Sequence, residues 1–410
     1  MRAMTNLKPL MTLVALFLLA SCSIEPPLRL PAQNVALDRQ AVEIRVEAIW
    51  ENPDWGYEFL YGWEQADVDL YGPAEYEDPK DFELRLYFLG ENPDAEHTRV
   101  TPSLMRSNFY RSMFYYGYHD ILMWSNIYTK DNTQSVLIDE RLDEVNASVT
   151  RNSSAPALVS ALQKHLAPNR VFMYNQPEIF YSAYYKNLHV TPNPDDYDYY
   201  DEQNHCYVKK CDLKGSPLVY IYLLQVVIRN NEGRIKGINS GAVVSGVSDS
   251  VNVNYGNTSR NSTSLLFDLG VKRTKVVPEG YLNQHHSGFL SQCQLNETVD
   301  VLGGRFTTYG LCGMKGYLQE PSRFYNGTEP ENKNLVAIDF TFKNDRDSII
   351  TFDLGDQMKN TCHGGVLTIE VDASDIPLPT NPNGGGGGGG SGFDPYIENY
   401  GDTVMTEITM

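Results

Sequence analysis

The side chains that could carry out catalysis in this chain are few, and their spacing fits no catalytic or phosphate-binding pattern. A serine hydrolase needs a strained G-x-S-x-G turn, and the nearest stretch, GVSDS at residues 246–250, lacks that form. His285 and His286 are adjacent, so in a strand their side chains would point to opposite faces and could not share one metal ion. Gly303 and Gly304 lack the further glycines and the lysine of a phosphate cradle, and a bend or bulge in a sheet explains them more simply. We therefore expect no enzyme, no cofactor and no metal site.

The cysteines do not form a regular framework either. They are Cys22, Cys206, Cys211, Cys293, Cys312 and Cys362. Cys206 and Cys211 are close enough in sequence to bridge a loop, and Cys293 could meet Cys312 across neighbouring strands, although spacing alone does not assign the pairs. The C-x4-C spacing has no matching second pair, which argues against a zinc site.

Cys22 is the residue with the clearest predicted chemistry. Arg2 and Lys8 precede an apolar run at residues 10–20, which is too short to cross about 30 Å of hydrocarbon and is typical of an export signal. The letters LASC that end at Cys22 resemble the lipobox of bacterial lipoproteins, in which the cysteine becomes the acylated first residue. Cleavage elsewhere, with this cysteine discarded or free, is the alternative. Because Ser23 rather than Asp follows Cys22, we expect an anchor in the outer membrane. Glu25, the only acidic residue nearby, is the hint of export to the cell surface, and the sequence leaves the membrane leaflet open.

Charge and composition narrow the choice of partners. The net charge is −19, and removal of the signal, which holds two basic and no acidic residues, leaves −21. Such an acidic surface would repel phosphate backbones, so we expect no nucleic-acid partner. About 390 mature residues with 27 tyrosines predict two domains rich in β-sheet.

Apolar patterning predicts the elements that must position any site. In AVEIRVEA (41–48) and DFELRLYF (81–88), apolar and polar residues alternate, which is typical of half-buried strands in an antiparallel sheet. The apolar run at 218–228 and the short strands that follow it, as far as GGVLTIEVD (364–372), fit a β-sandwich. The one helix expected is SSAPALVSALQKHLAP (153–168).

The expected organisation has six parts. They are a signal peptide at 1–21, a tether at 22–34, a first β-domain with a helical insertion at 35–210, a second β-domain at 211–376, a glycine-rich linker at 377–393 and a terminal strand at 394–410. The second boundary is placed in DEQNHCYVKKCDLKG, which is polar and lacks an apolar period.

With these parts in hand, the chain resembles the fimbrillin (Mfa-like) superfamily of surface lipoproteins, and most closely a branch defined as a domain of unknown function. The similarity is clearest in VYIYLLQVVIRNNEGRI (219–235), which leads into AVVSGVSDSVNV (242–253), and in GGVLTIEVD (364–372) before the glycine linker. The resemblance implies an all-β protein with two tandem transthyretin-like or Ig-like sandwiches. It also implies a role in fimbriae or surface adhesion.

The C-terminus combines a slack tether with a strand pattern. Gly384 to Gly390, Ser391 and Gly392 form a flexible tether with an end-to-end distance of about 16 Å. In TVMTEITM, alternate positions form one strand face: Val404, Thr406, Ile408 and Met410. A strand this short needs a sheet to join, and it could add to an exposed edge. The resemblance implies insertion of such a strand into the next subunit, whereas folding back onto its own domain is the alternative.

Aromatic residues gather in NPDWGYEFLYGW (52–63). Trp55, Tyr57, Phe59, Tyr61 and Trp63 stand at alternate positions, so along a strand their rings would share one face. Such a face is either core or inter-domain packing, which we favour, or an exposed platform for sugar rings.

The function predicted from the sequence is a lipid-anchored structural or adhesion protein, a fimbrial subunit or anchor that assembles by terminal strand addition with other fimbrial or surface proteins. The alternative is a lipid-anchored glycan-binding protein that uses Trp55, Tyr57, Tyr61 and Trp63.

Overall fold

The structure is a computed structural model of the chain. It describes residues 39–49, 52, 55–79, 81–96, 99–125, 136–140, 145–151, 156–163, 173–283, 285–319, 322, 325, 333–376, 378–379 and 396–397. Cys22 and the alternating residues Val404, Thr406, Ile408 and Met410 lie outside the described residues. The predictions that rest on them therefore stay predictions.

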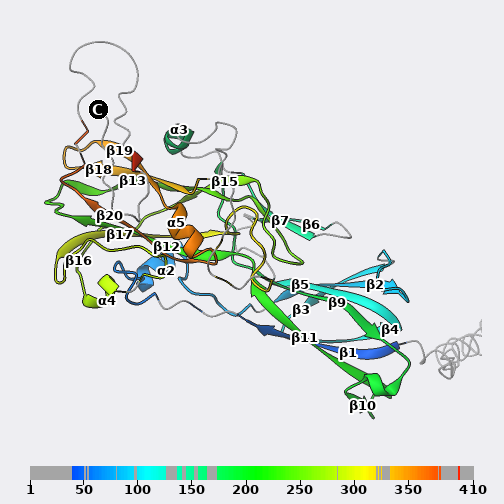
Figure 1. The fold of residues 1–410 in the computed structure, drawn as a ribbon. Coiled ribbons are helices and arrows are strands. Elements are labelled where there is room, and N and C mark those ends of the chain that lie inside the picture. The colour runs from blue at the N-terminus through cyan, green and yellow to red at the C-terminus, as the bar shows by residue number, and fades with distance from the viewer. Residues whose placement is uncertain are drawn as a thin grey trace, which may run out of the picture.

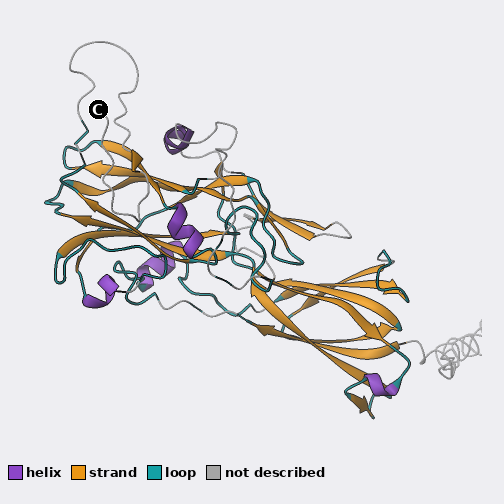
Figure 2. Ribbon diagram, viewed as in Figure 1, coloured by secondary structure: helices purple, strands orange, loops and turns teal. Residues whose placement is uncertain are grey.

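The protein is mostly β, as expected, and its first large sheet curls into a nearly closed barrel (Figures 1 and 2). The strand order is β3-β2-β5-β9-β11-β1-β4, with β10 paired to β11. The strands are β1 (Arg39–Ala48), β2 (Phe82–Gly90), β3 (Arg99–Met105), β4 (Phe109–Tyr115), β5 (Gly117–Ser125), β9 (Tyr181–Val190), β10 (Tyr199–Asp201) and β11 (Cys206–Pro217). Because β3 and β4 stand at the two ends of this order and are joined by residues 106–108, the two edges of the sheet come close together. We call this sheet the barrel.

Strands of the barrel form where apolar and polar residues alternate in the sequence. On β1, Val42 and Ile44 point into the barrel core together with Leu84 of β2, as the period of two predicts. The structure differs from the expectation in two ways. A single curled sheet replaces the two sheets of a sandwich, and β1 pairs in parallel with β11 as well as antiparallel with β4. The three-residue link from β3 to β4 accounts for the curl, since it holds the two ends of the sheet together.

The second large part is the β-sandwich expected from the later strands. One sheet has the order β16-β17-β12-β20 and the other β21-β19-β18-β13-β15-β8. Their strands are β8 (Met173–Tyr174), β12 (Tyr220–Arg229), β13 (Ile235–Ser248), β15 (Ser262–Phe267), β16 (Arg273–Val276), β17 (Thr298–Thr308), β18 (Leu335–Phe342), β19 (Asp347–Asp353), β20 (Gly365–Asp372) and β21 (Tyr396–Ile397). Tyr222 and Phe306 from the first sheet pack with Phe340 from the second in one buried core. We call these two sheets the sandwich.

A third, small sheet contributes to a contact between barrel and sandwich. It contains β6 (Val136–Glu140), β7 (Val145–Val149) and β14 (Ser250–Asn252). Leu122 and Trp124 of the barrel belong to the same buried cluster as Ala147 of β7 and Val251 and Tyr309 beside the sandwich. The contact between the two parts is therefore a continuous apolar core, which favours a fixed relative orientation.

In the described part of the chain, the helices are short and peripheral. They are α2 (Gln65–Tyr71), α3 (Pro156–Gln163), α4 (Glu279–Asn283), α5 (Gly355–Asn360) and the 3-10 turn at Pro194–Asp196. The expected helix is present as α3, and Leu158 and Leu162 on one of its faces pack against Val243 and Leu335 of the sandwich. Within the described ranges, no helix has the length and apolar character needed to cross a membrane.

The order of parts along the chain differs from the expected domain limits. A boundary between residues 210 and 211 would cut β11, which pairs with β1 from Val208 to Gly215. Segments placed in the first domain, 55–79, 156–163 and 173–174, pack on the sandwich. We therefore propose that the barrel ends before Leu218, and that the earlier segments named above belong to the sandwich.

The two pairings that spacing left open, Cys206 with Cys211 and Cys293 with Cys312, do not form: the five cysteines from Cys206 to Cys362 are buried thiols that no disulfide joins. Cys206 and Cys211 lie five positions apart on one strand, so they face opposite sides of the sheet. Cys293 precedes β17 and Cys312 follows it. The eleven residues of β17, about 36 Å of extended strand, therefore lie between the two cysteines. These cysteines therefore serve as buried packing residues and do not cross-link the chain.

A buried histidine predicts how the barrel responds to acid. His119 on β5 packs between Phe88 and Phe114, with ring centroids 5.0 Å away, and its Nε2 lies 2.8 Å from the Tyr115 carbonyl oxygen. Burial lowers its pKa to about 4 from the ordinary 6.5, against a smaller opposing effect of Asp120. Below pH 6.5 the unfolded chain therefore binds a proton that the folded chain refuses until about pH 4.

We expect the barrel to lose about 2 kcal/mol of stability between pH 7.5 and pH 5 through this histidine. Urea unfolding of the wild type and of His119→Gln at the two pH values checks this, because the variant lacks that contribution. An equal pH dependence in both proteins would contradict it.

Candidate functional site

The outer edge of β19 is where the structure places a strand from the C-terminal segment. β19 pairs with β18 along its whole length, from Asp347 to Asp353. On its other side it pairs in parallel with β21, with Thr351 opposite Tyr396 and Phe352 opposite Ile397. This two-residue strand, Tyr396–Ile397, therefore joins a sheet edge of its own chain. The strand face predicted at Val404, Thr406, Ile408 and Met410 lies outside the described residues and stays a prediction.

A second candidate edge is the seam of the barrel, where β3 and β4 face each other. In the part of the chain that the structure describes, no backbone ladder joins these two strands. A side-chain contact of 3.2 Å between Ser103 Oγ and Tyr110 OH bridges the seam. In the link between β3 and β4, the Asn108 carbonyl accepts a hydrogen bond from Val46 N of β1. The seam therefore leaves backbone donors and acceptors of both strands without strand partners.

The two sides of the seam are not equivalent. Pro102 on β3 has no N–H, so its pair with Arg85 of β2 is one without direct backbone hydrogen bonds. The nitrogen of Pro102 therefore points away from β2, toward the seam, where it cannot donate to an added strand. β4 contains no proline. Leu104, Phe109 and Met113 flank the seam and are between 43% and 47% exposed. An added strand would find backbone partners on β4 and apolar surface beside them.

The predicted aromatic face takes a different form in the structure. Residues 55–64 form turns rather than a strand, so alternate positions do not share one face. We call residues 55–79, which cross the outer side of the sheet β16-β17-β12-β20, the aromatic strap. Its Tyr61 is fully buried, Trp55 and Trp63 are half-buried, and Tyr57 is 59% exposed. The packing interpretation accounts for this segment better than a sugar platform does.

Glycines make the slot that holds Tyr61. A Cβ atom on Gly303 would lie 2.3 Å from the Tyr61 ring, and one on Gly270 would lie 2.4 Å from its hydroxyl oxygen. The Arg273 guanidinium covers the ring at 4.0 Å from its centroid. Gly303 is thus neither a bulge nor part of a phosphate cradle, because its missing side chain admits the ring. Burial, followed by the charge of Asp67, raises the pKa of the Tyr61 hydroxyl.

Polar contacts fix both ends of the strap helix α2. At its start, Asp67 accepts from the Glu64 backbone N–H and from Arg273 Nη2, each at 2.8 Å. At its end, Arg305 donates to the carbonyls of Pro73 at 2.7 Å and Tyr71 at 3.3 Å. A cation beside the last carbonyls and a carboxylate in the first turn both suit the helix dipole. Burial lowers the pKa of Arg305 to about 10, so it stays charged at neutral pH.

Gln225 of β12 joins the strap to the sheet as a short strand would. Its Oε1 accepts from the Tyr61 backbone N–H at 3.3 Å, and its Nε2 donates to the Glu58 carbonyl at 2.6 Å. Sequence reasoning missed these partners. The glycine pair at 303–304 inside a strand was a usable signal, since glycine in a strand often marks a close approach by another segment.

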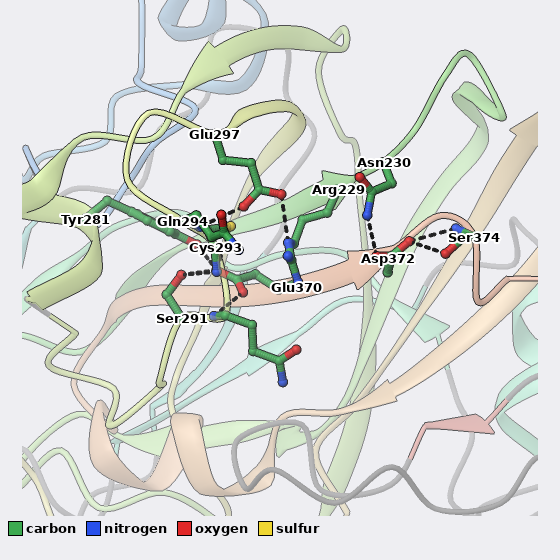
Figure 3. Close-up of polar contacts among 11 residues, drawn as sticks. Arg229, Asn230, Tyr281, Ser291, Cys293, Gln294, Glu297, Glu370, Asp372 and Ser374 are labelled. Atoms are coloured by element: carbon green, nitrogen blue, oxygen red, sulfur yellow. Dashed lines mark hydrogen bonds and ion pairs between the residues drawn. The ribbon is translucent and has the colours of Figure 1, made fainter.

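A cluster of polar side chains surrounds Glu370 at one end of β20 (Figure 3). This carboxylate is 5% exposed and accepts from Tyr281 OH at 2.8 Å, Gln292 N at 2.7 Å, Cys293 Sγ at 3.3 Å and also Ser291 Oγ. Burial and the nearby Glu370 charge raise the pKa of the Cys293 thiol. It is therefore a protonated donor rather than a thiolate nucleophile. The cluster holds the segment 281–293 on the sheet.

Sequence comparisons identify no family: no protein-family model matches the chain, and no curated protein matches it. Solved structures do match. A candidate adhesin from Bacteroides ovatus is 13% identical, with 82% of this chain and 94% of that chain covered, at a TM-score of 0.43. A candidate cell adhesion protein from Bacteroides eggerthii is 12% identical, with 90% and 94% covered, at 0.37. The fimbrial anchor protein Mfa2 from Porphyromonas gingivalis is 10% identical, with 81% and 90% covered, at 0.34. The chain is thus similar in structure to candidate Bacteroides adhesins and to a Porphyromonas fimbrial protein.

Proposed function

We propose that this chain is a lipid-anchored structural or adhesion protein of the outer membrane that assembles with fimbrial or surface partners by adding its C-terminal strand to a neighbouring subunit. The observation that carries the proposal is the parallel pairing of Tyr396–Ile397 with β19 after a run of seven glycines. A short strand on a slack tether suits addition to a sheet edge, where backbone hydrogen bonds supply the affinity.

The β4 side of the barrel seam is the acceptor that best suits such a strand. It offers a seven-residue strand already paired on its other side with β1, and no proline interrupts it. Leu104, Phe109 and Met113 supply exposed apolar surface for the alternate side chains of an incoming strand, such as Val404 and Ile408.

Deletion of residues 394–410 should leave the barrel folded and reduce association with partners at least tenfold, since the strand supplies the backbone ladder (about 1.4 kcal/mol for each factor of ten). Affinity purification of the tagged protein from membranes, with and without the deletion, measures the loss. Circular dichroism of the same preparations checks the fold.

Cys22→Ala is the matched control. It removes the proposed lipid site and should release the protein from the membrane while leaving its partners bound in the soluble fraction. Unchanged association of the deleted chain would rule out assembly by strand addition. Unchanged membrane retention of Cys22→Ala would rule out the anchor alone.

A further inference from the structure

We propose that the end of the barrel away from the sandwich rests on a lipid bilayer, with its tyrosine rings in the headgroup layer. We call this end the barrel pole, and it is formed by the outer ends of β1, β4, β5, β9, β10 and β11 (Figure 1). The inference rests on the proposed function, because a lipid on Cys22 would hold this end near a membrane. It adds to that anchor a second contact, made by side chains of the folded barrel.

Strand pairing brings the outer ends of these strands together. Tyr115, the last residue of β4, lies opposite Arg39, the first residue of β1. Tyr118 of β5 lies opposite His189 of β9. β1 and β11 run in parallel, and β11 ends just before Leu218 in the apolar contact with the sandwich. The first residues of β1 and β11 therefore lie at the end of the barrel that the sandwich does not cover.

Aromatic rings gather at the barrel pole and are only partly covered. Tyr118 and His189 stack with ring centroids 4.2 Å apart. Tyr207 packs against Tyr197 at 5.7 Å and against Tyr200 at 4.9 Å, and Tyr200 is 41% exposed. Tyrosine concentrates at membrane–water interfaces, because its ring enters the headgroup layer while its hydroxyl stays hydrated. A bilayer surface is therefore a partner that suits this collection of rings.

Charges of both signs lie among the rings. The Arg39 guanidinium is 3.8 Å from the ring centroid of Tyr115, and Lys209 Nζ is 6.0 Å from that of Tyr197. Such cations can meet lipid phosphates at the membrane surface. The chain around β10 also exposes four acidic residues: Asp195, Asp196, Asp198 and Glu202. Because the two signs oppose each other, the contact depends on the rings, and zwitterionic headgroups suit it better than anionic ones.

The length of the tether places a membrane within reach of the barrel pole. Arg39 follows Cys22 by 17 positions. A chain of this length has an end-to-end distance of about 23 Å as a coil and about 60 Å when fully extended. β1 itself has ten residues and is about 33 Å long, so the sandwich begins a strand length beyond the pole. The pole is therefore the described surface that the tether would hold nearest to the bilayer.

A dye that brightens on entering a bilayer tests the contact in the lipid-anchored full chain. Tyr200→Cys places a thiol at the barrel pole, and Leu290→Cys places one on the sandwich, where Leu290 is 71% exposed. The five native thiols from Cys206 to Cys362 are buried and should not react. In phosphatidylcholine vesicles, nitrobenzoxadiazole at position 200 should emit at least about twofold more strongly than in the lipid-free chain of residues 23–410 in solution. The same dye at position 290 should not change.

Single ring substitutions test whether the tyrosines make the contact. The chain of residues 23–410 has no lipid, so its flotation with phosphatidylcholine vesicles at high lipid concentration reports the barrel pole alone. Tyr118→Ala and Tyr200→Ala should each weaken this binding about threefold. Tyr185→Ala is the matched control and should not, since Tyr185 is 39% exposed on the same barrel but lies five positions before Val190, the pole end of β9. Raising the salt from about 0.05 M to 0.5 M should change binding less than twofold, because the charges oppose each other.

The two proposals can fail separately. If the lipid-anchored chain floats with vesicles while the dye at position 200 stays as dim as in solution, the anchor holds but the barrel pole does not touch the bilayer. If the dye at position 290 brightens equally, or if Tyr118→Ala and Tyr200→Ala bind vesicles like Tyr185→Ala, the inference is wrong. If the chain purified from cells does not float at all, the anchor is absent, and the reason for a bilayer beside the pole falls with it.

Discussion

Gly303→Val should lower the free energy of unfolding of the sandwich by about 3 kcal/mol, at the upper end of the usual range for forcing extra atoms into a packed core. A Cβ there would lie 2.3 Å from Cγ and Cδ1 of Tyr61, far inside contact distance. The ring has no room to shift, since it is fully buried under the Arg273 guanidinium. Typical domains have about 5–15 kcal/mol of stability, so the effect is large. Urea titration followed by circular dichroism measures it.

Gly237 gives the matched control for this substitution. It also lies on a sandwich strand, but a Cβ there would meet no heavy atom within 4 Å, so Gly237→Ala should change stability by less than about 0.5 kcal/mol. In a Tyr61→Ala background, Gly303→Val should cost much less, because the slot is already empty. The same cost in both backgrounds would show that glycine and ring do not interact.

A fragment of residues 218–379 should fail to melt cooperatively on its own. Without the aromatic strap, Phe59 and Tyr61 no longer cover Leu223, Val227 and Val301 on the outer face of the four-stranded sheet. Each missing ring costs about 3–5 kcal/mol, so their joint loss approaches the whole stability of a typical domain. Thermal melts by circular dichroism should show a broad, shallow change instead of a sharp transition.

A synthetic peptide of residues 55–79 separates the strap from the other missing parts, since the fragment also lacks α3 and β8. Adding this peptide should sharpen the transition, and the same peptide with Tyr61→Ala should not. A fragment that melts sharply without any peptide would mean that the sandwich is complete without the strap.

Local patterns predicted the strands whose two faces meet different surroundings. Val42 and Ile44 alternate with charged residues because one side of β1 faces the barrel core and the other faces outward. The apolar run of β12, interrupted only by Gln225, reflects burial on both faces, under the sandwich core on one side and the strap on the other. These features depend on near neighbours in sequence, and so the sequence displays them.

Other elements depend on partners far along the chain, and their patterns misled the prediction. β11 was assigned to a boundary because its period breaks: Val208 and Cys211 are both buried although they are three positions apart, with Lys209 and Lys210 between them. The alternating rings of residues 55–63 predicted a strand, whereas their burial comes from glycines about 210–240 positions later. No local period encodes such a slot.

The position of β1 has a mechanical consequence. This strand follows the proposed anchor and is an interior strand of the barrel sheet. It is paired over eight positions with β11 and over seven with β4. It stands at the opposite end of the molecule from β19 (Figure 1). Tension between a lipid-held N-terminus and a partner held at the other end would pull along β1, across its hydrogen bonds. In this shear geometry the bonds resist together instead of opening one by one, so the subunit should yield slowly under load, at a rate set by its unfolding barrier.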